Sequence, residues 1–253
     1  MVDIEQREIR HGVERDHHGW GVSKNKTDPA DYFSEIKGNT KSQTPHVSKE
    51  DFCLFCRLLY DRHLVTGVGG NVSVRMDERV LITPTGYSLR HMRPDLVVTV
   101  NERGKVLEGG IPTKDIGAHL GILHERPNIN VICHVHGAFI TAVSTLIEPG
   151  PDALPPVTPG FAYFAHPLAM IPFVVPGTSE FARATIRKFS DSPCHALLLQ
   201  NHGLVTIGEN FEEAINIAEE IDEAARVYLL TNGKARVISG ENVRKIKKTV
   251  SIP

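Results

Sequence analysis

The chain has 253 residues, of which 41% are hydrophobic, and its formal net charge is −2. This length and composition fit one large domain, or a medium domain with tails, whose core can form without the help of a metal. The nearly neutral charge gives no electrostatic reason to expect a nucleic acid or an anionic membrane as partner.

Residues 1–45 are polar and lack apolar periodicity, so we expect them to form a flexible N-terminal arm. They contain no apolar signal core, and no later stretch is long and apolar enough to span a bilayer. The four cysteines match neither a disulfide framework nor a zinc pattern, so we expect buried thiols and a cytoplasmic protein. We place the domain at 46–235 and a loose, basic C-terminal tail at 236–253.

The first half of the domain predicts a helix and two β-hairpins. Ser48 is a suitable N-cap for a helix at 48–63, and the residues of this helix expected to face inward are Phe52, Leu54, Phe55, Leu58 and Leu59. Alternating apolar residues after it predict paired strands, located at 71–75 with 80–83 and at 96–100 with 106–107.

The second half alternates between helical and strand patterns. Helices are expected at 114–126, from 138, at 179–189 and at 211–231, and strands at 130–134, 171–175, 196–200 and 204–207. The whole order predicts a single α/β domain with a central, mainly antiparallel sheet flanked by helices.

Two histidines stand two residues apart at the end of the strand at 130–134. Alternate residues of a strand point to the same face, so His134 and His136 can chelate one ion. This pair alone is equally compatible with two structural histidines in a core.

A third histidine favours a metal site over two structural histidines. Asn201-His202-Gly203 interrupts an apolar strand run, and burying an imidazole without a partner costs about 1–3 kcal/mol. Three protein ligands with an open fourth position are typical of catalytic zinc. We therefore expect a divalent metal on His134, His136 and His202, with zinc first and nickel, cobalt, iron or manganese as alternatives.

Asp115 begins the helix that precedes the histidine strand. A helix N-terminus stabilises a carboxylate there, and Asp115 can be a fourth ligand, a general base or an ordinary first-turn charge. Three nearby turns offer backbone N–H groups or hydroxyls to a phosphate or carboxylate. Their residues are Gly70, Asn71, Thr85, Gly86, Thr113 and Lys114.

These motifs, in this order, resemble the class II aldolase/adducin family from about residue 50 to 230. The resemblance rests on Gly70–Arg75, Leu81–Gly86, Glu108–Pro112, Thr113–His119, Arg126-Pro127, His134-Val-His136, Gly177-Thr178 and Leu198–Gly203. It implies a three-layer fold, a zinc site on the three histidines, acid/base chemistry at Asp115, a bound substrate phosphate at the three turns, and a homotetramer with its sites at subunit interfaces.

The implied reaction is the cleavage of a sugar 1-phosphate, of the fuculose 1-phosphate type, to dihydroxyacetone phosphate and an aldehyde. A metal-stabilised enediolate would be the intermediate, and small phosphorylated sugars or hydroxy-carbonyl compounds the substrates. The alternatives are an epimerase, dehydratase or decarboxylase of the same family, and a non-catalytic, adducin-like interaction module.

The chain departs from the family's aldolase pattern at several positions. Asp115 stands where the aldolase has a glutamate, and Lys114 where it has a serine. Pro159 falls near the position of an active-site tyrosine, and Ala162 at that of a catalytic aspartate of the epimerase branch. The segment 234–253 contains no tyrosine to match the aldolase's tail. These changes affect proton transfer and leave the expected metal ligands in place.

Overall fold

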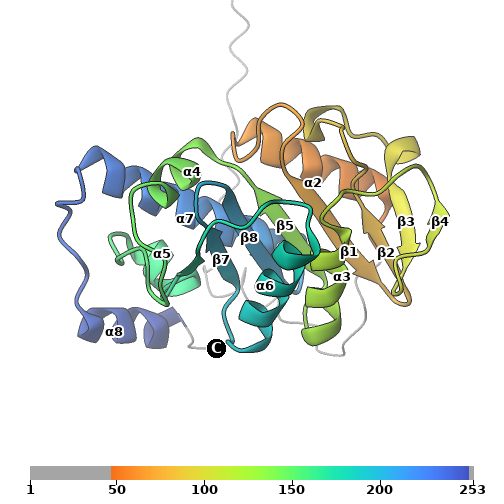
Figure 1. Ribbon diagram of the computed structural model, residues 1–253. Coiled ribbons are helices and arrows are strands. Elements are labelled where there is room, and N and C mark those ends of the chain that lie inside the picture. Colours follow the sequence, from red (N-terminus) through yellow and green to blue (C-terminus); the bar gives the residue numbers. More distant parts are fainter. Residues whose placement is uncertain (1–46, 251–253) are drawn as a thin grey trace, which may run out of the picture. The chain divides into compact units, whose positions relative to one another are not determined.

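An eight-stranded sheet forms the centre of this computed structural model, which describes residues 47–250 (Figure 1). The strand order is β4-β3-β2-β1-β5-β8-β7-β6, and every neighbouring pair is antiparallel except the parallel pair β6 and β7. The strands are β1 (Asn71–Met76), β2 (Arg79–Ile82), β3 (Val98–Asn101), β4 (Val106–Glu108), β5 (Val131–Val135), β6 (Ala169–Ile171), β7 (Ala196–Leu199) and β8 (Gly203–Gly208). The predicted mainly antiparallel sheet is thus confirmed.

Helices cover both faces of this sheet. They are α2 (Lys49–Asp61), α3 (Ile116–Glu125), α4 (Ala138–Ser144), α5 (Pro159–Phe164), α6 (Ser179–Ser190), α7 (Phe211–Leu230) and α8 (Gly240–Val250), with short 3-10 turns η1 (Leu89–His91) and η2 (Pro94–Leu96). One core lies between the sheet and α2, α4, α5 and α7, and a second lies between the sheet and α3 and α6. Figure 1 shows α3 and α6 side by side in front of the sheet. The three-layer α/β fold is therefore as expected.

Strand β5 shows how alternation builds the two cores. Val131, Cys133 and Val135 belong to the core under α2 and α7, whereas Ile132 belongs to the core under α3 and α6. Successive side chains of a strand point to opposite faces, so His134 shares the face of Ile132. This places the first metal-ligand candidate on the α3 and α6 side.

Several predictions about single elements were wrong. In α2, Phe52 and Leu59 are buried as predicted, but Leu54 and Leu58 are exposed, because Cys53 and Cys56 complete the buried stripe. The strand expected at 171–175 lies at Ala169–Ile171, and α5 was not expected.

The C-terminal segment is not a loose tail within the described residues. Gly240–Val250 forms α8, which packs against α5 and buries Val243. The predicted arm at 1–45 lies outside the described residues, and the domain limits 46 and 235 stay a prediction. None of the helices between residues 47 and 250 has the length and apolar character to cross a membrane.

Candidate active site

Three histidine rings meet at one end of β5. His134 lies on β5, His136 follows its last residue, and His202 lies in the turn between β7 and β8. The Nε2 atom of His134 is 2.9 Å from Nε2 of His136 and 3.2 Å from Nε2 of His202. The ligand atoms of all three residues lie within 4.8 Å of one another. The folded chain thus brings together the three residues that the sequence analysis grouped as ligands.

Burial keeps these imidazoles neutral, which is the form that binds a metal. It lowers the pKa of His134 well below its ordinary value, and the neighbouring His136 and His202 lower that pKa further. Burial, followed by the charge of His202, lowers the pKa of His136 to about 4. Burial also lowers the pKa of His202.

The hydrogen bond of the other ring nitrogen fixes the tautomer of His134. Its Nδ1 lies 3.0 Å from the backbone oxygen of Leu204, which can only accept, so Nδ1 carries the proton. The lone pair of Nε2 therefore faces the other two rings. In metal sites, the ring nitrogen of a ligand histidine that does not bind the metal typically donates to an acceptor such as a backbone oxygen.

The residues present fit a divalent metal. Tetrahedral zinc with Zn–N bonds of about 2.0–2.1 Å sets its nitrogen ligands roughly 3.3 Å apart, close to the separations around His134. Without a cation, the single Nε2 lone pair of His134 would face two ring nitrogens and could satisfy only one. An ion between the rings would account for their convergence.

The backbone next to the rings leaves no room for larger residues. A Cβ at Gly203 would lie 2.3 Å from the backbone oxygen of Val135 and 2.8 Å from Cδ2 of His136. Asn201, two residues earlier, adopts a φ of 55°, a left-handed conformation that asparagine tolerates. The Asn-His-Gly sequence thus makes the tight turn that carries His202 to the end of β5.

The histidines open into a cavity of about 260 Å³. All ten residues that the sequence analysis selected line it: Gly70, Asn71, Thr85, Gly86, Thr113, Lys114, Asp115, His134, His136 and His202. Pro176 and Gly177 line it as well. Pro159 and Ala162, where the family's aldolase and epimerase carry other residues, lie in α5 and are absent from this lining.

The carboxylate of Asp115 is held at one oxygen only. Nδ2 of Asn71 donates to its Oδ2 at 2.8 Å. Its Oδ1 is shielded from solvent and has no hydrogen-bond partner among the described residues. Because Oδ1 has no such partner, it is the carboxylate oxygen that remains for a metal or a substrate proton.

His119 and Ser73, which connect to Asp115 through Asn71, were not predicted from the sequence as site residues. His119 is 2% exposed, and its ring is hydrogen-bonded to Oδ1 of Asn71 at 2.5 Å and to Oγ of Ser73 at 2.7 Å. Burial lowers the pKa of His119 to about 4, although the charge of Asp115 acts in the opposite direction. The spacing of four residues between Asp115 and His119 on a predicted helix was a usable signal, because such residues share a face.

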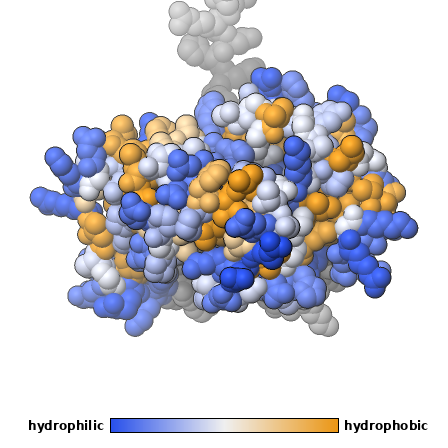
Figure 2. Space-filling model, viewed as in Figure 1, coloured by the Kyte–Doolittle hydropathy of each residue, from blue (hydrophilic) through white to orange (hydrophobic). Residues whose placement is uncertain are grey.

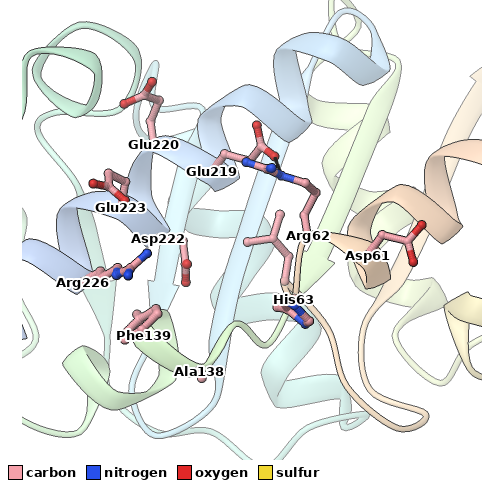
Figure 3. A pocket seen from close by; sticks show the side chains of 11 residues that line it. Asp61, Arg62, His63, Ala138, Phe139, Glu219, Glu220, Asp222, Glu223 and Arg226 are labelled. Carbon is pink, nitrogen blue, oxygen red and sulfur yellow. Dashed lines mark hydrogen bonds and ion pairs between the residues drawn. The ribbon is translucent and has the colours of Figure 1, made fainter. Parts of the chain in front are cut away.

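A second, larger cavity of about 630 Å³ lies elsewhere, between α2, α4 and α7. Figure 3 shows the ion pair of Arg62 and Glu219 at its rim, with Glu220 and Glu223 nearby on α7. None of the three converging histidines lines it. Size alone therefore does not identify the reactive cavity, and the ligand set does.

Comparison with known proteins agrees with this geometry. The family model described as the class II aldolase and adducin N-terminal domain matches residues 50–229, which is more than half of the chain. The chain belongs to the class II aldolase/adducin family.

Relatives within the family carry more than one activity name. L-fuculose phosphate aldolase of Methanococcus maripaludis is 34% identical over 185 residues, 73% of this chain and 98% of the relative. 3-Oxo-tetronate 4-phosphate decarboxylase of Haemophilus influenzae is 31% identical over 207 residues, 81% of this chain and 98% of the relative. A solved L-fuculose 1-phosphate aldolase superposes with a TM-score of 0.73 at 27% identity, covering 82% of this chain and 98% of that one. The names describe lyases that act on small sugar phosphates.

Proposed function

We propose that this chain is a zinc-dependent aldolase that cleaves a sugar 1-phosphate, of the fuculose 1-phosphate type, to dihydroxyacetone phosphate and an aldehyde. The observation that carries the proposal is the convergence of three neutral imidazoles beside the unpartnered Oδ1 of Asp115. The aldolase name of a 34% identical relative supports the reaction class.

His134, His136 and His202 would hold the ion through their Nε2 atoms, and the backbone oxygen of Leu204 keeps His134 in the tautomer that this requires. When bound, a divalent ion supplies a Lewis acid for a carbonyl oxygen and for the negative charge that develops next to it. Other divalent transition metals offer the same chemistry with these ligands.

Asp115 would move the proton. A general base must reach the proton that it takes within a hydrogen-bond distance, and Asp115 lines the same cavity as the three imidazoles. The opposite oxygen, Oδ2, is already bonded to Asn71. We therefore assign the proton transfer to Oδ1.

The phosphate would bind at the remaining wall. Thr85 and Thr113 contribute hydroxyls, Gly70 and Gly86 contribute backbone without side chains, and Lys114 contributes an ammonium group. The resemblance to tetrameric aldolases also leads us to propose a cytoplasmic homotetramer.

A decarboxylase is the second candidate, and one observation favours it. Lys114 is exposed at the cavity and suits a substrate carboxylate as well as a phosphate. A relative with 31% identity carries the name 3-oxo-tetronate 4-phosphate decarboxylase. Loss of carbon dioxide and cleavage of an aldol both need a polarised carbonyl, so one metal site serves both reactions.

Turnover and metal content together test the proposal. Purified protein is assayed with fuculose 1-phosphate and 3-oxo-tetronate 4-phosphate, before and after chelation, while elemental analysis counts the bound metal. We expect dihydroxyacetone phosphate from the first substrate, loss of activity on chelation, and recovery with Zn²⁺.

Two variants provide the control. His202→Ala should lower both metal content and turnover by at least about 100-fold, because one of three ligands is lost. His124→Ala, at an exposed position of α3, should change neither. Release of carbon dioxide from the second substrate alone would favour the decarboxylase. Activity in protein free of metal would contradict the mechanism, and metal-free protein without any turnover would favour the adducin-like module.

A further inference from the structure

Four side chains form a single hydrogen-bonded line from the protein interior to the reactive cavity. Ser73 contacts His119 at 2.7 Å, His119 contacts Asn71 at 2.5 Å, and Asn71 contacts Asp115 at 2.8 Å. Ser73, His119 and Asn71 are 0%, 2% and 7% exposed. Water therefore cannot readily replace any of these three partners.

The carboxylate at the end of the line determines the direction of every bond in it. A carboxylate only accepts, so Asn71 must present its Nδ2 to Asp115 and its Oδ1 to His119. That oxygen also only accepts, so Nε2 of His119 carries the proton. Nδ1 of the neutral ring then accepts from the hydroxyl of Ser73.

The opposite orientation of the Asn71 amide is disfavoured for the same reason. A rotation by 180° would bring its Oδ1 against Oδ2 of Asp115, so that two acceptors would face each other. His119 and Ser73 prevent that rotation by holding Oδ1 on the other side. A buried network in which every member is satisfied fixes one geometry.

The same strands hold the line and the histidines. Asn71 on β1 is the register partner of His134 on β5, and Ser73 is the partner of Ile132. The sheet therefore sets the separation between the amide that holds Asp115 and the first imidazole.

We propose that Asn71, His119 and Ser73 are positioning residues for Asp115: they fix its Oδ2 and leave Oδ1, which has no hydrogen-bond partner among residues 47–250, as the oxygen that takes part in proton transfer. The inference rests on the proposed function, since Asp115 is the proton-transfer group there. It also revises the expected role of Asn71, because both ends of its carboxamide are committed to protein side chains. A substrate anion could then be bound only by the backbone N–H of Asn71 or by the second hydrogen of its Nδ2.

The first test compares substitutions of the two histidines of α3. His119→Leu removes the donor to Asn71, and a carboxylate displaced by about 1 Å can cost 10²-fold in rate. We expect kcat to fall by about 10- to 100-fold, with KM changed less than about threefold and metal content unchanged. His119→Gln keeps an N–H donor and should recover part of kcat, and His124→Leu should match the wild type. An unchanged kcat in His119→Leu would overturn the proposal.

The second test asks whether His119 acts through Asp115. Residues of one network show non-additive effects, and independent sites add. In an Asp115→Asn background, His119→Leu should therefore change the remaining turnover less than about twofold. A further loss of turnover as large as in the wild-type background would show that His119 acts independently of Asp115, and would overturn the proposal.

The third test does not depend on turnover. In a crystal structure of zinc-loaded His119→Leu, or of Ser73→Ala if the first variant does not fold, the Asp115 carboxylate should be rotated or disordered. A carboxylate that keeps its bond to Asn71 would overturn the positioning role even in an active enzyme. If the wild type turned over no sugar phosphate, the proposed function would fail, and this structure would still decide the inference.

Discussion

Burial controls the protonation of single residues in two separate parts of this molecule. In the candidate active site it lowers the pKa values of His119, His134, His136 and His202, which keeps four imidazoles neutral in a small volume. In the larger cavity it raises the pKa values of two carboxyl groups, Glu220 and Asp222. The lowered pKa values keep the histidines in the neutral form that can bind a metal. The raised pKa values of the two carboxyl groups oppose the folded state at neutral pH.

Glu220 gives a pH-dependent prediction. Its pKa is raised above 4.5 first by burial and then by Glu223 and Glu219. An acid with a raised folded-state pKa favours folding at low pH, and this contribution is lost as the pH rises through that pKa. Glu220→Gln should therefore raise Tm at pH 7.5 by roughly 1–2 °C, a small shift because solvent screens the group. The gain should vanish below about pH 4.

Calorimetry or circular dichroism at the two pH values measures this shift. Glu78→Gln, in the exposed turn between β1 and β2, provides a matched control that should show no gain. A lower Tm for Glu220→Gln at pH 7.5 would contradict the reasoning.

Some residues of the site were predictable and others were not. His202 was recognisable because a polar Asn-His-Gly interrupts two buried strand pieces, and the turn glycines because few residues make such turns. The spacing of His119 from Asp115 placed both on one helix face, but the role of His119 comes from its bonds to Asn71, 48 residues earlier, and to Ser73 on the same strand. A hydrogen bond between distant segments leaves no local pattern in the sequence.

Among the elements, α6 connects helix capping to the histidine site. Thr178 is its N-cap, and Oγ1 accepts from the backbone N–H of Phe181 at 3.2 Å. The Phe181 ring is buried, with its centroid 5.6 Å from that of His202 and 6.3 Å from that of His134. The start of this helix thus carries the aromatic ring that packs against two of the three ligand candidates.

Removing the cap should weaken this arrangement measurably. Thr178→Ala should cost about 1 kcal/mol of stability, or roughly 2–4 °C in Tm for a chain of this size. Thr178→Ser keeps the acceptor and should lose less than half as much. Thermal unfolding of the two variants side by side measures the difference, and equal losses would show that the methyl group matters more than the hydrogen bond.

The elements that sequence patterns missed have weak patterns for physical reasons. Helix α5 is six residues long and begins Pro159-Gly160, two residues that usually signal a turn. Helix α8 is so rich in lysine and arginine that its apolar side, Val243 and Ile246, is easily overlooked. The two helices pack against each other, and α5 also packs against α7, so tertiary contacts rather than local patterns stabilise them.

At the scale of the whole molecule, the layers of the fold were more predictable from the sequence than the number of subunits. Figure 2 shows apolar side chains gathered near the middle of the face that carries α3 and α6. The exposed large apolar residues of the described chain include Ile111, Leu146, Phe173 and Val175. Exposed apolar surface is typical of contacts between subunits, which is in line with the proposed homotetramer.

A shortened chain tests the domain limits and the assembly together. We expect residues 46–253 to keep the metal content, the Tm within about 2 °C, and the subunit number of the full chain, because helices between residues 47 and 250 already cover both faces of the sheet. Light scattering after size-exclusion chromatography measures the mass, and thermal unfolding measures Tm. An assembly smaller than that of the full chain, or a large loss of stability, would show that residues 1–45 contribute to the folded unit.

The pairing of β1 with β5 joins two halves of the sheet, β1 to β4 and β5 to β8. The site lies across that junction, and His134 and His202 are 68 residues apart in the chain. Of the three candidate ligands, the unfolded chain can therefore offer an ion only the local pair His134 and His136, and the third nitrogen arrives when β5 and β8 dock. Contacts of such long range form late in folding, and an interaction completed after the transition state slows unfolding more than it speeds folding. A bound ion would thus act on the lifetime of the folded sheet.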